Sequence, residues 1–222
     1  LYDADKVTAA AATENEHDLL DAQLDLLLDP NDPEVQAAAR RFEAAGAIVE
    51  PMRPFMTQTM LDGMDHFWRM RSRLDMNALM PADKARVLPY IRAWADSATG
   101  MDGEAVFRAA SQFHAVRVAS VKACAAFDYV ISPTAPMPAF PAELPSPTND
   151  PLHPLEHIGF TVPYNMSEQP AASINCGYTS EGLPVGLQIA GQRFDDLGVL
   201  QVARAFELIR DVQRPWPQPP GP

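Results

Sequence analysis

The sequence is short of basic residues and of long apolar runs, and each shortage excludes a class of protein. Lysine and arginine together number 17 against 29 acidic residues, for a formal net charge of -12. A polyanion such as nucleic acid is therefore repelled across most of the surface. No apolar run approaches the roughly 20 residues that cross a bilayer. The first residues, 1–5, also lack the basic and apolar regions of a signal peptide. We therefore expect neither a nucleic-acid partner nor a membrane.

Cysteine is equally scarce, since Cys124 and Cys176 are the only two. They form neither a CxxC pair nor the dense pattern of a secreted disulfide scaffold, which favours a reducing, cytoplasmic setting. A catalytic Cys176 would need a histidine and an exposed, electropositive surrounding. Its place beside Gly177 in an alternating segment predicts a buried, unreactive thiol instead.

What the sequence does contain is a succession of helical and strand patterns. Leucines at helical spacing predict a helix over residues 1–29. The segment 32–34, Asp-Pro-Glu, supplies a capping side chain, a first-turn proline and a first-turn acid, so a second helix begins here and ends at Gly46. The short β-branched segment 47–50 then predicts a buried strand.

Residues 60–125 show three helical patterns, the second starting at Pro81 and the third at Gly103. A buried guanidinium is costly unless it is paired. Because Arg117 falls on the apolar stripe of the third helix, we expect it to meet an acid such as Asp128 or the carboxylate of a substrate. The stripe comprises Val106, Ala110, Phe113, Arg117, Val121 and Cys124.

Strand patterns dominate the second half of the chain. Residues 127–132 predict a strand, and the segments 172–178 and 185–191 alternate on either side of a Gly-containing turn, as in a β-hairpin. In the last of these segments Gly186 and Ala190 thin one face, so a helix is expected to approach closely there.

Nine prolines fall within residues 133–163 and exclude a regular helix or a central strand, so this segment is predicted to be an ordered surface loop. Asp195 and Asp196 precede an amphipathic segment and predict a capped last helix, and residues 215–222 form a proline-rich tail. Strands alternating with helices indicate a single α/β layered domain.

Three segments resemble the C-terminal portion of the amidase-signature family. FDYVISPTAP at 127–136 is similar to the family's aromatic-Asp, apolar-strand and Pro-Thr motif. The block at 163–196, PYNMSEQPAASINCGYTSEGLPVGLQIAGQRFDD, resembles its Asn, Pro-Ala-x-Ser and Gly-Leu-Pro-x-Gly-Leu-Gln pattern. DPEVQAAARRFEAAGAIVE at 32–50 is similar to the helix-strand unit that precedes them. The likeness is poor over residues 1–31.

The resemblance implies a place for the chain in an α/β/α sandwich around a mixed β-sheet, with residues 1–222 as the C-terminal portion of a single domain. In the family a Gly/Ser-rich signature in the N-terminal half supplies two serines and a lysine for acyl-enzyme chemistry. No such segment occurs here, so we assign no catalytic residue to this chain. The absence of an initiator methionine at Leu1 is compatible with a start partway through a longer protein.

The resemblance further implies that the Pro-Thr strand end, the proline-rich loop and the Gln-Pro-Ala turn shape a substrate pocket. In place of binding substrate, Thr134 would simply end a strand and Asn165 would hydrogen-bond to the loop backbone. Methionines provide an adaptable apolar wall. The candidate substrate-binding residues are Thr134, Met137, Asn165, Met166, Gln169 and Arg117.

Replacement chemistry within this chain finds little support. A lysine base must be desolvated, whereas Lys6, Lys84 and Lys122 fall in segments where solvated surface charges are expected. His153 to His157 matches the H-x-x-E-H pattern of some zinc peptidases, but the surrounding prolines leave room for about one helical turn, and we assign no metal and no cofactor.

The leading hypothesis is therefore the C-terminal part of an amidase that hydrolyses a small carboxamide, with the N-terminal half of the same protein as its essential partner. A homo-oligomer is compatible with the sequence. One alternative is a component of a glutamine-dependent amidotransferase, a branch that tends to keep an acid where this chain has 157–159, with Glu156 just ahead. Another is a non-catalytic module that binds a partner through an open sheet edge.

Overall fold

The computed structural model describes residues 32–215. The helix expected over 1–29 and nearly all of the expected tail lie outside this range. A three-stranded antiparallel sheet of order β1-β3-β2 is central to the fold. Its strands are β1 (Tyr129–Pro133), β2 (Ala171–Tyr178) and β3 (Pro184–Gly191). The predicted strand and hairpin are thus confirmed. The hairpin carries a register shift between Asn175 and Gly177 that alternation alone does not reveal.

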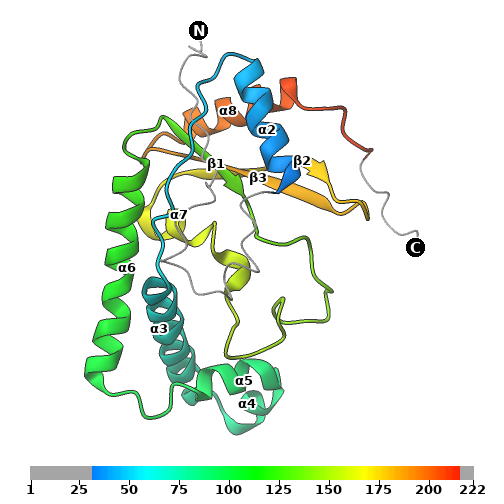
Figure 1. Ribbon diagram of the computed structural model, residues 1–222. Helices are drawn as coiled ribbons and strands as arrows, with labels where there is room; N and C mark the ends of the chain where they lie inside the picture. Colours follow the sequence, from blue (N-terminus) through cyan, green and yellow to red (C-terminus); the bar gives the residue numbers. More distant parts are fainter. Residues whose placement is uncertain (1–31, 216–222) are drawn as a thin grey trace.

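Two helices, α2 (Pro33–Ala44) and α8 (Asp196–Ile209), cover one face of the sheet (Figure 1). Both begin as predicted, because Asp32 Oδ1 accepts from Glu34 N at 2.8 Å and Asp195 Oδ1 accepts from Gly198 N at 3.1 Å. The main core lies between these helices and the sheet. It includes Val35, Phe42, Ile131, Leu187, Ile189, Val199, Val202 and Phe206.

The outer side of α8 carries exposed apolar side chains among charged ones, which include Arg204 and Glu207. Its exposed side chains lie opposite the buried face of the helix, at positions three to eight residues apart. We call the apolar ones, together with Phe194 just before the helix, the α8 outer stripe: Phe194 (90% exposed), Leu197 (68%), Leu200 (62%) and Leu208 (70%).

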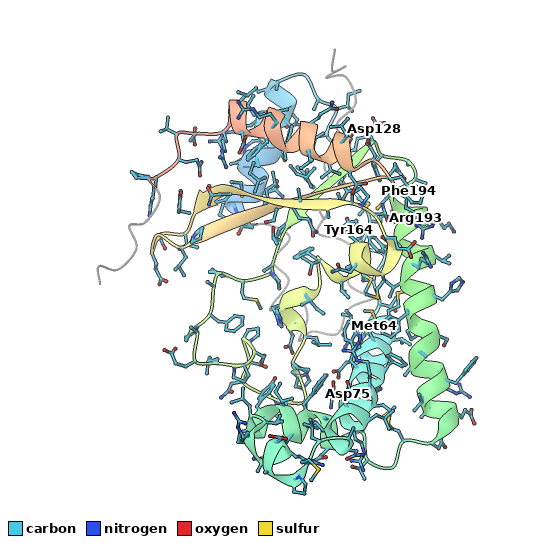
Figure 2. All side chains as sticks on the ribbon, turned by 180° about the vertical axis from the view of Figure 1, so that it is seen from behind. Met64, Asp75, Asp128, Tyr164, Arg193 and Phe194 are labelled. Carbon is cyan, nitrogen blue, oxygen red and sulfur yellow. The ribbon has the colours of Figure 1, made fainter. Side chains whose placement is uncertain are left out.

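Helices on the other side of the sheet form a second layer (Figure 1). They are α3 (Gln58–Asn77), α6 (Gly103–Cys124) and the short α7 (Val162–Ser167). Cys124, Val130, Tyr164 and Ala190 join α6 and α7 to the sheet in a small core. Helices therefore lie on both sides of the sheet, and the predicted α/β layered fold is confirmed. Figure 2 shows Tyr164 below the sheet and Met64 farther down on α3.

The structure corrects two sequence predictions near the N-terminal end. Residues 47–50 are not a strand, and Ile48 is 61% exposed. Ala47 and Val49 do pack on the core, but no strand pairs with this segment within residues 32–215, and an extended segment becomes a strand only through such pairing.

The helix expected from Pro81 is two helices, α4 (Pro81–Arg86) and α5 (Pro89–Asp96). The break occurs at Leu88 because the residue before a proline is disfavoured in the helical region, and Leu88 has φ -52° and ψ 135°.

The buried stripe of α6 also differs from the prediction. Its buried residues are Ala109, Val116, Ser120 and Cys124. The helix is rotated relative to the predicted stripe because it packs against both α3 and α7. Consequently Arg117 is not an inward-pointing residue, and its side chain is 36% exposed.

The proline-rich segment is an ordered loop, as predicted, and ends in a 3₁₀ turn, η2 (Glu156–Ile158), just before α7. It extends from β1 toward α5 and returns (Figure 1). Tyr90 on α5 donates to Ser146 Oγ at 2.8 Å, and Arg69 on α3 donates to Leu152 O at 2.9 Å. None of the helices within residues 32–215 is both long and apolar enough to cross a membrane.

Candidate functional site

The face of the sheet opposite α2 and α8 carries small hydroxyl side chains. Thr134, just beyond β1, and Ser173 on β2 place their hydroxyl oxygens 2.6 Å apart. They meet over Gly186 of the central strand, where an added Cβ would lie 2.7 Å from Thr134 Oγ1. The space left by Gly186 is thus filled by this hydroxyl pair and not by a helix, contrary to expectation, whereas at Ala190 helices α6 and α7 do pack closely, as expected. Because Ser173 is exposed, the pair faces outward.

Gln188 connects this polar face to the end of the proline-rich loop. Its Nε2 donates to Ser132 Oγ at 3.0 Å and to Phe160 O at 2.8 Å, while the side chain is nearly inaccessible to solvent. The loop is therefore fixed against the sheet immediately before α7 begins. Met137, three residues after Thr134, is half-buried in the outgoing part of the same loop.

Helix α7 carries the next two predicted residues. Asn165 is exposed, and its Nδ2 donates to Thr161 O at 3.2 Å. This contact is the backbone bond that the structural alternative predicts, but it leaves the residue accessible. Met166 packs beside Met64 and Val116 in the core between α3, α6 and α7. Its half-buried side chain contributes to an apolar surface next to Asn165.

Gln169 is buried, and both ends of its amide are bound. Its Oε1 accepts from Ser120 Oγ and Ser167 Oγ, each at 2.9 Å, and its Nε2 donates to Gly191 O at 2.9 Å. These contacts join α6, α7 and β3 in the interior. Gln169 thus holds these elements together in the interior, and its role in binding substrate stays a prediction.

Arg117 forms an ion pair with Glu168 and not with Asp128. The expected partner was wrong because α6 turns Arg117 toward the end of α7, whereas Asp128 is exposed next to β1. Glu168 has φ 61° and ψ 29°, a left-handed conformation that residues with a Cβ seldom adopt. No pattern in the sequence indicates this conformation.

The structure therefore groups the predicted residues in two sets. Asn165, Met166, Gln169 and Arg117 gather around α7, and Thr134 and Met137 lie at the end of β1. The prediction missed Ser120, Glu168 and Ser173, which bind to members of these sets. It also missed Gln188, which fixes the loop to the sheet through Ser132 and Phe160 O. Strand alternation could have found Ser173 and Gln188, since both belong to the same face as Thr134.

Glu156 and His157 are the titratable groups of the loop that burial perturbs. Burial raises the pKa of the Glu156 carboxyl group and lowers that of the His157 imidazole. Glu156 Oε1 lies 3.6 Å from His153 Nδ1, whereas its Oε2 is buried without a hydrogen-bond partner among the described residues. The side chain is 12% exposed. Glu156 is therefore held in a place that disfavours its charge.

Replacing Glu156 by glutamine should make stability less dependent on pH. Because the pKa in the folded state lies above its ordinary value of 4.5, the folded state binds the proton more tightly. The penalty is absent well below that value, grows as pH rises through the ordinary and then the raised pKa, and persists above both. In urea unfolding from about pH 4 to about pH 8, the free energy of unfolding of Glu156→Gln should rise relative to that of the wild type as pH rises.

Glu143 lies exposed on the same loop and provides the matched control. The free energy of unfolding of Glu143→Gln should differ from that of the wild type by the same amount across this pH range. If the free energy of unfolding of Glu156→Gln also differed from that of the wild type by the same amount at every pH, the raised pKa of Glu156 would be contradicted.

Neither a thiol nor a lysine in the described part of the chain is set up as a nucleophile or base. Burial, together with the charges of Asp32 and Glu34, raises the pKa of Cys176 to about 12. Lys122 is exposed, and Lys84 Nζ lies 3.4 Å from Asn77 Oδ1 at the surface. Lys6 lies outside the described residues.

Both cysteines should resist alkylation in the native protein. Cys124 and Cys176 are 2% and 4% exposed, and burial raises the pKa of each thiol. Since the thiolate is the reactive form, iodoacetamide at about pH 8 should add to neither residue before urea is present and to both afterwards. Intact-mass spectrometry gives the count. Rapid addition of one carbamidomethyl group to the native chain would show an activated thiol and support a cysteine nucleophile.

Comparison with known proteins places the chain in a family. The sequence matches the Amidase family over residues 27–200. It is 45% identical over 87 residues to the A subunit of the glutamyl-tRNA(Gln) amidotransferase from Myxococcus xanthus (strain DK1622), a match covering 39% of this chain and 18% of that protein.

Solved structures show the same fold at low sequence identity. A bacterial aryl acylamidase of the amidase signature family superposes with a TM-score of 0.70 at 21% identity, covering 93% of this chain and 44% of that one. A second structure, described as an amidase, gives a TM-score of 0.72 at 18% identity and covers 95% and 46%. The chain thus spans less than half the length of these structures. Because the family match extends over most of its residues, the chain belongs to the amidase family.

Proposed function

We propose that this chain forms the substrate-facing C-terminal part of an amidase that hydrolyses a small carboxamide by acyl-enzyme chemistry. Two serines and a lysine from the N-terminal half of the same protein perform the bond cleavage, and backbone N–H groups stabilise the oxyanion. The chain contributes the wall against which the amide lies. Its buried free thiols suit the cytoplasm as the compartment.

The outward-facing Thr134–Ser173 pair is the observation that supports this proposal most. When two hydroxyls share one short hydrogen bond, the acceptor hydroxyl keeps its own proton for donation. A substrate carbonyl next to the pair can accept that proton, and Asn165 adds a second uncharged polar group. Met137 and Met166 provide an adaptable apolar border for the substrate's carbon skeleton.

A component of a glutamine-dependent amidotransferase is the second candidate, and the similarity to the Myxococcus xanthus protein favours it. Glutamine carries an ammonium and a carboxylate group, which need partners of opposite charge. Of the candidate substrate-binding residues only Arg117 is charged, and Glu168 already neutralises it. The polar groups that face outward are neutral, so we favour an uncharged carboxamide.

Activity measurements on two forms of the protein test these proposals. The complete protein should release ammonia or amine from a panel of aliphatic and aromatic amides, and the 222-residue chain alone should release none. Turnover by the isolated chain would contradict the assignment of the catalytic groups. Turnover of glutamine alone would favour the amidotransferase, and inactivity of the complete protein on every amide would favour a non-catalytic binding module.

A single hydroxyl can be tested within the same assay. Thr134→Val keeps the shape of the side chain and removes one partner of the pair, so kcat/KM of the complete protein should fall by about tenfold, as expected for one lost hydrogen bond. Thr99→Val changes a hydroxyl that donates to Asp96 O on the surface and should leave kcat/KM unaltered. Equal values for both variants would remove Thr134 from the site.

A further inference from the structure

The turn that follows α7 is held by side chains from two other parts of the chain. We call residues 167–169 the α7 turn. Ser167 O accepts a hydrogen bond from Arg193 Nε at 2.5 Å, and Glu168 forms the ion pair with Arg117. Arg117 lies on α6, and Arg193 lies between β3 and α8. The two guanidinium groups therefore connect the turn to both the helical layer and the sheet.

The conformation of the α7 turn requires such support. Glu168 is left-handed, and a residue with a Cβ keeps that conformation only when its surroundings impose it. Helix α7 has six residues and no side-chain cap at its N-terminal end. Since so short a helix has little stability of its own, its direction is set by the packing of its buried side chains and by the contacts at its ends.

Helix α7 also carries the exposed amide of Asn165 and the side chain of Met166. A tilt of the helix would move both groups relative to the Thr134–Ser173 pair. The contacts that fix the α7 turn therefore also fix the substrate-facing surface. This connection acts through the α7 turn and requires no contact between either arginine and the substrate.

We propose that Arg117 and Arg193 are positioning residues, which hold the left-handed α7 turn and thereby set the direction in which α7 presents Asn165 to the substrate. The role in substrate presentation rests on the proposed amidase function. The role in holding the turn does not. The Arg117–Glu168 pair is the better one to test, because its partner is a side chain and can be exchanged.

Hydrogen exchange in the complete protein tests the structural step without any assay of activity. In Arg117→Gln the backbone amides of residues 162 and 164–169 should exchange about fivefold faster, as for the loss of a partly exposed ion pair. Amides of β3 should exchange at the wild-type rate. The exchanged pair Arg117→Glu with Glu168→Arg should restore most of the protection, because it re-forms the ion pair in the opposite sense.

The matched control is Arg108→Gln, which removes an exposed ion pair with Glu104 on the same helix. Exchange in residues 162–170 should not change in this variant. If Arg117→Gln also leaves that segment at the wild-type rate, the α7 turn does not depend on the pair and the proposal is overturned.

Kinetics of the complete enzyme test the second step. Arg117→Gln should raise KM for a neutral amide several-fold while kcat changes little, since a positioning residue acts through the α7 turn and not on the reacting atoms. Faster exchange together with an unchanged KM would mean that Arg117 holds the α7 turn but plays no part in presenting Asn165 to the substrate. Absence of turnover in the wild type would refute the amidase proposal, and the exchange experiment would still decide whether the arginine holds the turn.

Discussion

Replacing Phe206 by alanine should lower the free energy of unfolding by about 3–5 kcal/mol. The side chain is fully buried in the core between α8 and the sheet, and its ring stacks on Phe42 with the ring centroids 5.3 Å apart. Truncation removes apolar contacts with α2 and the strands at once, and the packed surroundings close the resulting cavity only in part. Urea unfolding monitored by far-UV circular dichroism measures the loss.

Leu200→Ala on the same helix is the control, because that side chain is 62% exposed. It should change the free energy of unfolding by no more than about 0.5 kcal/mol. Similar losses for the two variants would mean that α8 does not pack on the sheet through Phe206.

Replacing Arg69 by methionine should cost about 3–5 kcal/mol, because it leaves a buried carboxylate without its cation. Arg69 Nε donates to Asp65 Oδ2 at 2.7 Å, and the two side chains are only 7% and 12% exposed. The same guanidinium donates to Ser97 Oγ at 2.8 Å and to Leu152 O at 2.9 Å. Loss of Arg69 therefore also releases the proline-rich loop from α3.

Two further variants separate the ion pair from the packing. In the double variant Arg69→Met with Asp65→Leu, much of the stability should return, because no unpaired charge remains in the interior. Arg86→Met removes an exposed pair with Asp83 and should cost no more than about 1 kcal/mol. If the double variant is as unstable as Arg69→Met, the loss of stability comes from the lost loop contacts and not from the unpaired carboxylate of Asp65.

Local sequence signals predicted the elements whose causes are local. The caps at Asp32 and Asp195, the hairpin and the inward face of α8 depend on residues close together in sequence. Elements that depend on distant partners were predicted less well. Segment 47–50 has the composition of a strand but no pairing strand among the described residues, and α6 rotates because two helices pack against it.

The candidate site follows the same division. Thr134, Asn165 and Met166 came from a resemblance of motifs, and their role in binding substrate stays a prediction. The partner of Arg117 was predicted as an acid such as Asp128, which is near in sequence, or a substrate carboxylate. The acid that it meets, Glu168, is 51 residues away and reaches it only through the left-handed turn. Contacts of this kind are decided by tertiary packing, which a single sequence does not show.

The α8 outer stripe affects how folding of this chain can be monitored. Exposed apolar side chains bind hydrophobic fluorescent dyes such as anilinonaphthalene sulfonate even when every helix and strand is intact. Dye fluorescence from the native chain would therefore report Phe194 and its leucine neighbours and not partial unfolding. Near-ultraviolet circular dichroism of the buried aromatic rings is the more faithful signal of the native state.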